Sequence, residues 1–232
     1  MINADQIHSS VDILILVGGG SFNLDDLTRY ADAGRVIAVD GGLGACLRAG
    51  IKPIAVIGDM DSVHKDDIAA LGSEVALQKI DEQDSTDLEK ALNFIDTPLC
   101  LGFGFLGRRF DHALAALSVL ARMSSKRPTL KIVLVGRHDA LTVTKRVINT
   151  AFPVGTRYSV FPLGKVTFER SDGLFWPLDG LTLLPEGQVS TSNRTSSDVQ
   201  SLHPAADNPA PFALIVPVNC LQSLIEAASS SP

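Results

Sequence analysis

From residue 12 to about residue 136 the chain repeats one unit, a short run of Val, Ile and Leu followed by a Gly- or Asp-rich turn and an amphipathic segment. This alternation is typical of strands and helices that build a parallel sheet. We therefore predict an α/β domain over residues 1–137. The apolar runs are 12–17, 35–39, 54–57, 74–79, 98–103 and 130–135, and the helical stretches lie near 24–33, 42–49, 64–71, 87–95 and 111–123.

The runs Ile13–Val17 and Ile132–Val135 are continuously apolar, which is typical of central strands that are buried on both faces. In such sheets ligands bind beyond the carboxyl ends of the strands, where the loops gather. We expect the functional residues in the loops that follow the strands.

After Gly136 the helical spacing stops, and short segments at 158–163, 166–170 and 181–184 are separated by Gly, Pro, Asp and Ser. This pattern predicts an antiparallel β domain over residues 138–232. Within it we expect a long loop at 195–211, a late strand at 212–218 and a frayed end from Ser229.

Composition places the chain in the ordinary globular class, with 45% hydrophobic and 20% charged residues. The net charge of −6 and the absence of a basic run argue against a nucleic-acid partner. Cys46, Cys100 and Cys220 are odd in number and far apart, so they suggest neither disulfides nor zinc. The first apolar run is too short for a signal or a membrane span, and we expect a cytoplasmic protein without membrane association.

Carboxylates follow two of the predicted strands. Asp59 and Asp61 are two residues apart, so in extended backbone their side chains face the same way. Two carboxylates in this arrangement could bind Mg²⁺. The alternative is an Asp-rich turn that leads into a helix without binding a metal. Residues 81–87 are also acidic, where Thr86 and Glu89 have capping-box spacing and Asp87 suits the helix dipole. Because repulsion between the two loops would be costly without a cation, together they favour a metal site.

Residues 102–112 contain G-x-G-x-x-G followed by Arg109, Asp111 and His112. A dinucleotide site is a weak alternative, because the motif falls at the fifth unit instead of the first. The glycines, Gly107 included, suit a backbone that approaches phosphates, with Arg109 as a charged fork on the same oxygens. No P-loop, G-x-S-x-G or H-E-x-x-H motif is present.

Taken in order, these motifs and two in the second half resemble those of the thiamine pyrophosphokinase family, over about residues 12–218. They are Asp40–Gly42, Gly58–Ser62, Gln83–Asp87, Gly107–His112, Gly173–Trp176 and Ser190–Asn193.

The resemblance implies an α/β catalytic domain followed by a β-sandwich, a homodimer, and transfer of a pyrophosphoryl group from ATP to the hydroxyl of thiamine. It implies a role in magnesium binding and catalysis for Asp59, Asp61 and Asp87, and in catalysis for Arg109 and Asp111. Nucleotide contacts fall to Gln83, Thr86, Gly107 and Arg109, and thiamine contacts to Asp40, Trp176, Ser190, Ser192 and Asn193.

Trp176 by itself would read as a sandwich core residue, and 190–193 as a polar turn. If thiamine is the ligand, Trp176 is instead expected to contact it, because the face of an indole ring attracts the cationic thiazolium ring of thiamine. Phe175 stands where the family pattern favours a basic or polar residue, and the loop to Pro211 diverges from that pattern.

The residues leave three questions open. Asp59 or Asp111 could accept the proton of the attacking hydroxyl. Another acceptor, such as a pterin alcohol or water, would need the acidic loops but not Trp176. A thiamine or nucleotide sensor without catalysis could share the fold, although it would not need a complete set of carboxylates.

Overall fold

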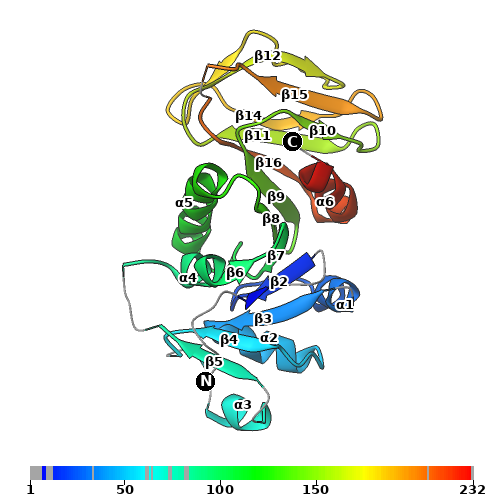
Figure 1. Ribbon diagram of the computed structural model, residues 1–232. Coiled ribbons are helices and arrows are strands. Elements are labelled where there is room, and N and C mark those ends of the chain that lie inside the picture. The colour runs from blue at the N-terminus through cyan, green and yellow to red at the C-terminus, as the bar shows by residue number, and fades with distance from the viewer. Residues whose placement is uncertain are drawn as a thin grey trace. The chain divides into compact units, whose positions relative to one another are not determined.

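The computed structural model in Figure 1 describes the chain except for a few short segments. The described residues are 7–8, 13–32, 34–60, 63, 65–72, 75–80, 84–207 and 209–230. The chain divides into two compact units, one of residues 1–119 and 134–137, the other of residues 120–133 and 138–232. Helix α5 (Phe110–Lys126) and strand β8 (Lys131–Val135) contribute residues to both units.

The first unit contains a parallel sheet, as the sequence predicts. Its core strand β2 is fully buried from Leu14 to Val17. A separate short pair joins β1 (Ile7–His8) to β6 (Ile95–Asp96). In spatial order the parallel strands are β7 (Leu99–Phe103), β2 (Ile13–Val17), β3 (Arg35–Val39), β4 (Ala55–Gly58) and β5 (Ala76–Lys79).

The strand order reverses direction at β2. From β2 the chain adds β3, β4 and β5 on one side, and then places β7 on the other side of β2. Loops that leave neighbouring strands in opposite directions open a crevice between them, where ligands bind in open α/β sheets. The topology therefore points to the loops after β2 and β7.

Side-chain caps start two helices of this unit, α1 (Leu24–Ala31) and α4 (Asp87–Phe94). The Asn23 side chain accepts from the Asp25 amide at 3.2 Å, and the Thr86 hydroxyl accepts from the Glu89 amide at 3.3 Å. Each bond satisfies a backbone donor that the helix itself leaves unpaired. The other short helices are η1 (Asp40–Gly42), α2 (Leu43–Arg48) and α3 (Lys65–Ala70).

The second unit holds two antiparallel sheets. One is part of a 10-stranded sheet and has the order β14 (Ser190–Arg194), β11 (Arg157–Pro162), β16 (Phe212–Pro217) and β9 (Asp139–Thr144). The other has the order β10 (Ile148–Thr150), β15 (Gln200–Pro204), β12 (Val166–Asp172) and β13 (Thr182–Leu183). Phe168 of one sheet meets Phe212 of the other edge to face, with ring centres 5.1 Å apart. This contact across the sheets confirms the sandwich.

Two expectations for the second unit are wrong. Residues 195–211 are not one long loop, because Gln200 begins strand β15, where its side chain is buried and accepts from the Thr150 hydroxyl and the Phe152 amide. The expected frayed end is wrong for Ser229 and Ser230, which lie in a helix after the 3₁₀ turn η2 (Val218–Cys220), while residues 231–232 lie outside the described residues. Helix α6 (Leu221–Ser230) includes Ser229 and buries Leu224 and Ile225, a spacing visible in the sequence.

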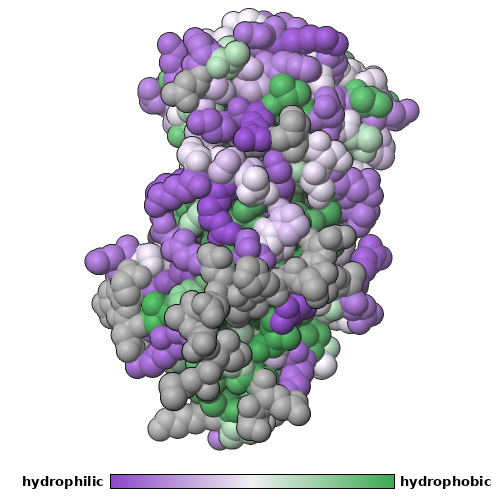
Figure 2. All heavy atoms as spheres, in the orientation of Figure 1, coloured by the Kyte–Doolittle hydropathy of each residue, from purple (hydrophilic) through white to green (hydrophobic). Residues whose placement is uncertain are grey.

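On the face drawn in Figure 2, hydrophilic residues cover most of the second unit and hydrophobic ones are scattered among them. Within the described ranges, no helix combines the length and the apolar character needed to cross a membrane.

Candidate functional site

Three loops meet at the carboxyl edge of the parallel sheet through backbone contacts. The Gly18 amide donates to the Phe103 carbonyl at 2.7 Å, and the Gly20 amide donates to the Gly104 carbonyl at 2.9 Å. A Cβ at Gly42 would lie 1.7 Å from the Val17 carbonyl oxygen, which no side chain tolerates. Glycine is therefore required where the loops after β2, β3 and β7 approach each other.

A cavity of about 310 Å³ lies beside these loops. Arg108 comes from the loop after β7 and donates from Nη1 to the Gly19 carbonyl at 3.3 Å. Such a volume is at the lower end of that of small-molecule sites, and guanidinium groups suit phosphate oxygens. The described lining contains three arginines and no carboxylate. It consists of Gly19, Gly20, Ser21, Phe22, Leu24, Ala45, Arg48, Arg108 and Arg137.

These three arginines are not among the residues predicted from sequence. Arg137 lies in the loop after β8. Because ligands bind beyond the carboxyl ends of parallel strands, its position in the sequence could have marked it as a candidate. Arg108 is next to the predicted Arg109. Arg48 ends helix α2, and nothing in its spacing distinguishes it from a surface residue.

Arg109 is instead paired with Asp111. Its Nε lies 3.2 Å from Asp111 Oδ1 and its Nη2 lies 2.5 Å from Oδ2, with both side chains 63% exposed. The hydrogen bonds and charge of Arg109 lower the pKa of the Asp111 carboxyl, and those of Asp111 raise the pKa of Arg109. Asp111 is therefore a weaker proton acceptor than an ordinary aspartate.

Three carboxylates from three loops interact at the same edge. Asp40 begins η1, Asp59 follows β4, and Asp87 begins α4. Burial raises the pKa of Asp87, Lys90 opposes this change, and the charges of Asp40 and Asp59 add to it. The structure thus brings these carboxylates within electrostatic range of one another, while Asp61 and Gln83 lie outside the described residues.

Lys90 is a member of this cluster that the sequence did not reveal. Its side chain is only 5% exposed, and its Nζ lies 3.5 Å from Asp87 Oδ1, one turn earlier on α4. A lysine is seldom buried unless it is paired. Nothing in the sequence marks Lys90 as buried, because its burial depends on how α4 packs.

The cluster fits a hard cation in its chemistry. Neighbouring carboxylates that raise the pKa of Asp87 repel one another, and a divalent cation with oxygen ligands would relieve that repulsion. In the part of the chain that the structure describes, no three His, Cys, Asp or Glu side chains form a group that could hold a metal. Asp61 lies outside these residues.

Strained backbone accumulates in the same loops. Asp40, Met60 and Arg108 have φ values of 45°, 68° and 65°, and Ser192 in the second unit has 60°. These are all the described non-glycine residues with positive φ. Conformations of this kind persist where the surrounding structure enforces them, and they cluster at functional sites.

In the second unit, Trp176 is 54% exposed and is not a core residue. Its ring lies edge to face with Phe175, with centres 4.7 Å apart. The Arg194 guanidinium lies 3.9 Å from the centre of the Phe175 ring and 5.7 Å from that of Trp176. This aromatic pair therefore already attracts a planar cation.

Asn193 fixes the backbone of Trp176. Its Oδ1 accepts from the Trp176 amide at 3.2 Å and from the Arg194 amide at 2.8 Å, while its Nδ2 donates to the Trp176 carbonyl at 2.7 Å and to Ser190 Oγ at 3.5 Å. These bonds use the whole capacity of the amide, which is 2% exposed. The Ser192 amide donates to Ser159 Oγ at 2.9 Å, so the segment is a held strand instead of a free turn.

We expect Asn193→Ala to lower the free energy of unfolding by about 2 kcal/mol, because several buried hydrogen bonds are lost together. Urea unfolding measures this change. Thr191→Ala, at an exposed position of the same strand two residues earlier, is the control and should change stability by less than about 1 kcal/mol. Equal stability of the two variants would contradict a supporting role for Asn193.

The fold and the site define a class of protein in which an α/β unit with a phosphate-suited sheet edge is joined to an antiparallel β-sandwich. Residues 28–134 match the thiamin pyrophosphokinase catalytic domain. Thiamine pyrophosphokinase 1 of Oryza sativa subsp. japonica is 30% identical over 63% of this chain and 61% of its own. The thiamine pyrophosphokinase of Bacillus subtilis is 31% identical over 53% of this chain and 60% of its own.

A solved structure, the thiamin pyrophosphokinase of Candida albicans, matches with a TM-score of 0.79 over 92% of both chains at 15% identity, which supports the fold. The chain is thus similar to thiamine pyrophosphokinases in sequence over residues 28–134 and in fold over most of its length. It spans between 60% and 65% of the length of the first curated relatives that it matches.

Proposed function

We propose that this chain transfers the pyrophosphoryl group of ATP to the hydroxyl of thiamine, giving thiamine diphosphate and AMP. The observation that carries the proposal is the single sheet edge at which three arginines line a cavity and three carboxylates interact. Transfer of a pyrophosphoryl group needs arginines that position the phosphates and carboxylates that hold a cation. Its catalysis depends on positioning the substrates and on neutralising the negative charge of the phosphates. The likeness to thiamine pyrophosphokinases supports thiamine as the acceptor.

ATP would place its phosphates in the cavity of Arg48, Arg108 and Arg137, with further contacts from Gln83, Gly107 and Arg109. Thr86 supports this region through its cap on α4. Asp59, Asp61 and Asp87 would hold Mg²⁺, which when bound supplies positive charge to the polyphosphate. We assign proton acceptance to Asp59, because the pKa of Asp111 is lowered by Arg109.

Thiamine would bind through the exposed ring of Trp176, with Ser190 and Ser192 as polar contacts and Asn193 as the support of the Trp176 backbone. We propose that residues 1–137 form the domain for ATP and magnesium and residues 138–232 the domain for thiamine and dimerisation. The assembly would be a cytoplasmic homodimer.

Incubation of the purified chain with ATP, Mg²⁺ and thiamine tests the function directly. We expect thiamine diphosphate and AMP in equal amounts, measured by chromatography. Formation of ADP, or of AMP at the same rate without thiamine, would contradict the proposal. Thiamine binding without turnover would favour a sensor.

Mg²⁺ at about ten times its dissociation constant should raise the melting temperature by roughly 2–5 °C. The rise should be lost in Asp59→Asn and retained in Asp96→Asn, which removes a charge from an exposed position. It should fade as the pH falls through the raised pKa of Asp87, because protons compete with the metal for the carboxylate. If Mg²⁺ raises the melting temperature equally in the parent, Asp59→Asn and Asp96→Asn, then Mg²⁺ binds elsewhere.

Arg108→Gln should raise the KM for ATP by about tenfold or more and leave the KM for thiamine within about twofold, because a charge-assisted contact to phosphate is lost. Initial rates with each substrate varied in turn measure both constants. Arg29→Gln, on the exposed face of α1, is the matched control. A defect mainly in the KM for thiamine would show that the cavity does not hold the phosphates.

A further inference from the structure

A cation of the chain itself occupies the aromatic pair of the second unit. The guanidinium of Arg194 lies over the ring of Phe175, 3.9 Å from its centre, and 5.7 Å from the centre of the Trp176 ring. The two rings meet edge to face with centres 4.7 Å apart, so the guanidinium lies beside Trp176 and not on the far side of Phe175. Both distances are within the roughly 6 Å over which an aromatic face attracts a cation.

The backbone of Arg194 is fixed, whereas its side chain is exposed. Its amide donates to Asn193 Oδ1 at 2.8 Å, and its carbonyl accepts from the Phe175 amide at 2.9 Å. Arg157, the residue opposite on β11, is paired with Asp139, whereas Arg194 forms no ion pair within the described part of the chain. Rotation of the side chain is therefore enough to remove the guanidinium from the rings, and strand β14 does not need to move.

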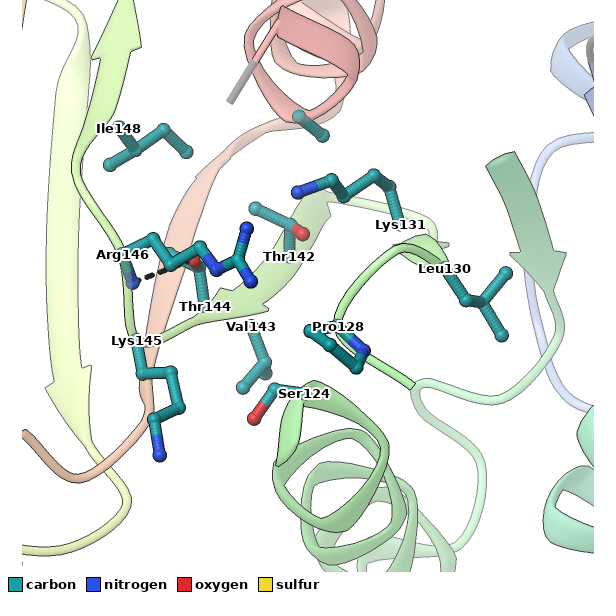
Figure 3. Close-up of a pocket in the computed structure, with 11 residues that line it drawn as sticks. Ser124, Pro128, Leu130, Lys131, Thr142, Val143, Thr144, Lys145, Arg146 and Ile148 are labelled. Carbon is teal, nitrogen blue, oxygen red and sulfur yellow. Dashed lines mark hydrogen bonds between the residues drawn. The ribbon is translucent and has the colours of Figure 1, made fainter. Parts of the chain in front are cut away.

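A cavity elsewhere in the second unit is too small for an aromatic ligand. Figure 3 shows this cavity, which residues of α5, β8 and β9 line, with Lys131 and Arg146 pointing toward each other. Its volume is about 30 Å³, whereas a single water molecule requires roughly 10–15 Å³. It can hold water but not a thiazolium ring, so the exposed aromatic pair is the better site for an aromatic cation.

A ligand cation and the guanidinium of Arg194 cannot share the aromatic pair. The two positive charges repel each other, and the ring face that the guanidinium covers is closed to a second planar group. A ligand cation must therefore displace the guanidinium and forfeit an attraction that the protein already has. At an exposed site this loss corresponds to about two- to fivefold in affinity.

We propose that Arg194 is a specificity-determining residue that competes with the ligand cation for the faces of Phe175 and Trp176. An aromatic cation that only replaces the guanidinium gains nothing. Binding then requires further contacts, such as those of a second ring with Ser190 and Ser192. The inference rests on the proposed binding of thiamine at Trp176, because a ligand that bound elsewhere would not meet Arg194.

Fluorescence of Trp176 tests the competition, because this residue is the only tryptophan of the chain. Titration with thiamine, followed by the Trp176 emission, measures the dissociation constant without turnover. Arg194→Gln should lower this constant by about two- to fivefold, because the competing cation is removed. Arg194→Lys keeps a cation and should change it by less than about twofold. Lys165→Gln removes a charge from an exposed position of the same unit and should match the parent.

The sign of the change separates competition from support. If Arg194 held the rings in place for the ligand, Arg194→Gln would weaken thiamine binding, and either that result or an unchanged constant would overturn the proposal. Because Arg194 is exposed, its variants should keep the melting temperature of the parent. Failure of the proposed function gives a different result, in which thiamine changes the Trp176 emission of neither the parent nor Arg194→Gln. That result would remove the thiamine site itself, and the competition with it.

Discussion

Asp87→Asn is expected to lower the turnover number to about one thousandth or less of the parent value and to leave thiamine binding almost unchanged. The variant keeps the shape of the side chain and removes its charge. That charge lies among Asp40, Asp59 and Lys90 at the sheet edge, where burial makes each electrostatic interaction stronger. Thiamine binding should survive, because the change is confined to the acidic loops of the first unit.

Thiamine-dependent AMP formation measures turnover, and isothermal titration with thiamine measures binding. Asp96→Asn, an exposed change just after the end of α4, is the control and should retain the parent rate. Because Asp87→Asn also removes the carboxylate partner of buried Lys90, Asp59→Asn provides a second variant that keeps this ion pair. If both variants fold and turn over within about threefold of the parent, the acidic cluster is not the catalytic centre.

Trp176→Ala is expected to raise the KM for thiamine by about tenfold or more and to leave the KM for ATP within about twofold. A ligand cation over an indole gains roughly 0.5–2 kcal/mol, and the lost stacking area adds to this effect. The guanidinium of Arg194 already rests on the Phe175 and Trp176 rings, which shows that this pair offers a face to a planar cation.

Initial-rate measurements with each substrate varied in turn test this prediction. Trp176→Phe keeps a smaller aromatic face and should fall between the parent and the alanine variant. Val154→Ala, another exposed apolar position of the second unit, should match the parent. A defect confined to the KM for ATP would show that Trp176 does not contact thiamine.

Local sequence patterns were sufficient for most of the architecture. The continuous apolar run of β2, the Thr86 cap of α4 and the late strand β16 depend on residues that are near one another in the chain. A continuous apolar run and a capping hydroxyl leave a direct trace in the order of residues. The sequence also contains the helical apolar spacing of α6, although the β pattern before it favours strands for this part of the chain.

Partnerships between distant residues could not be read in this way. Gln200 lies in a buried strand because its amide meets Thr150 and Phe152, about fifty positions earlier. The same holds for Asn193, whose amide supports Trp176. Polar residues without periodicity look like a loop until their partners are known.

The sequence by itself determined the α/β-then-β order, the family likeness and the loops in which carboxylates gather. Only the tertiary structure decided that Arg108 faces the cavity while Arg109 pairs with Asp111, and that Lys90 is buried beside Asp87. The physical reason is that strand and helix periods are set by neighbours in the chain. The direction of a charged side chain is set instead by burial and by charges that the fold brings from elsewhere.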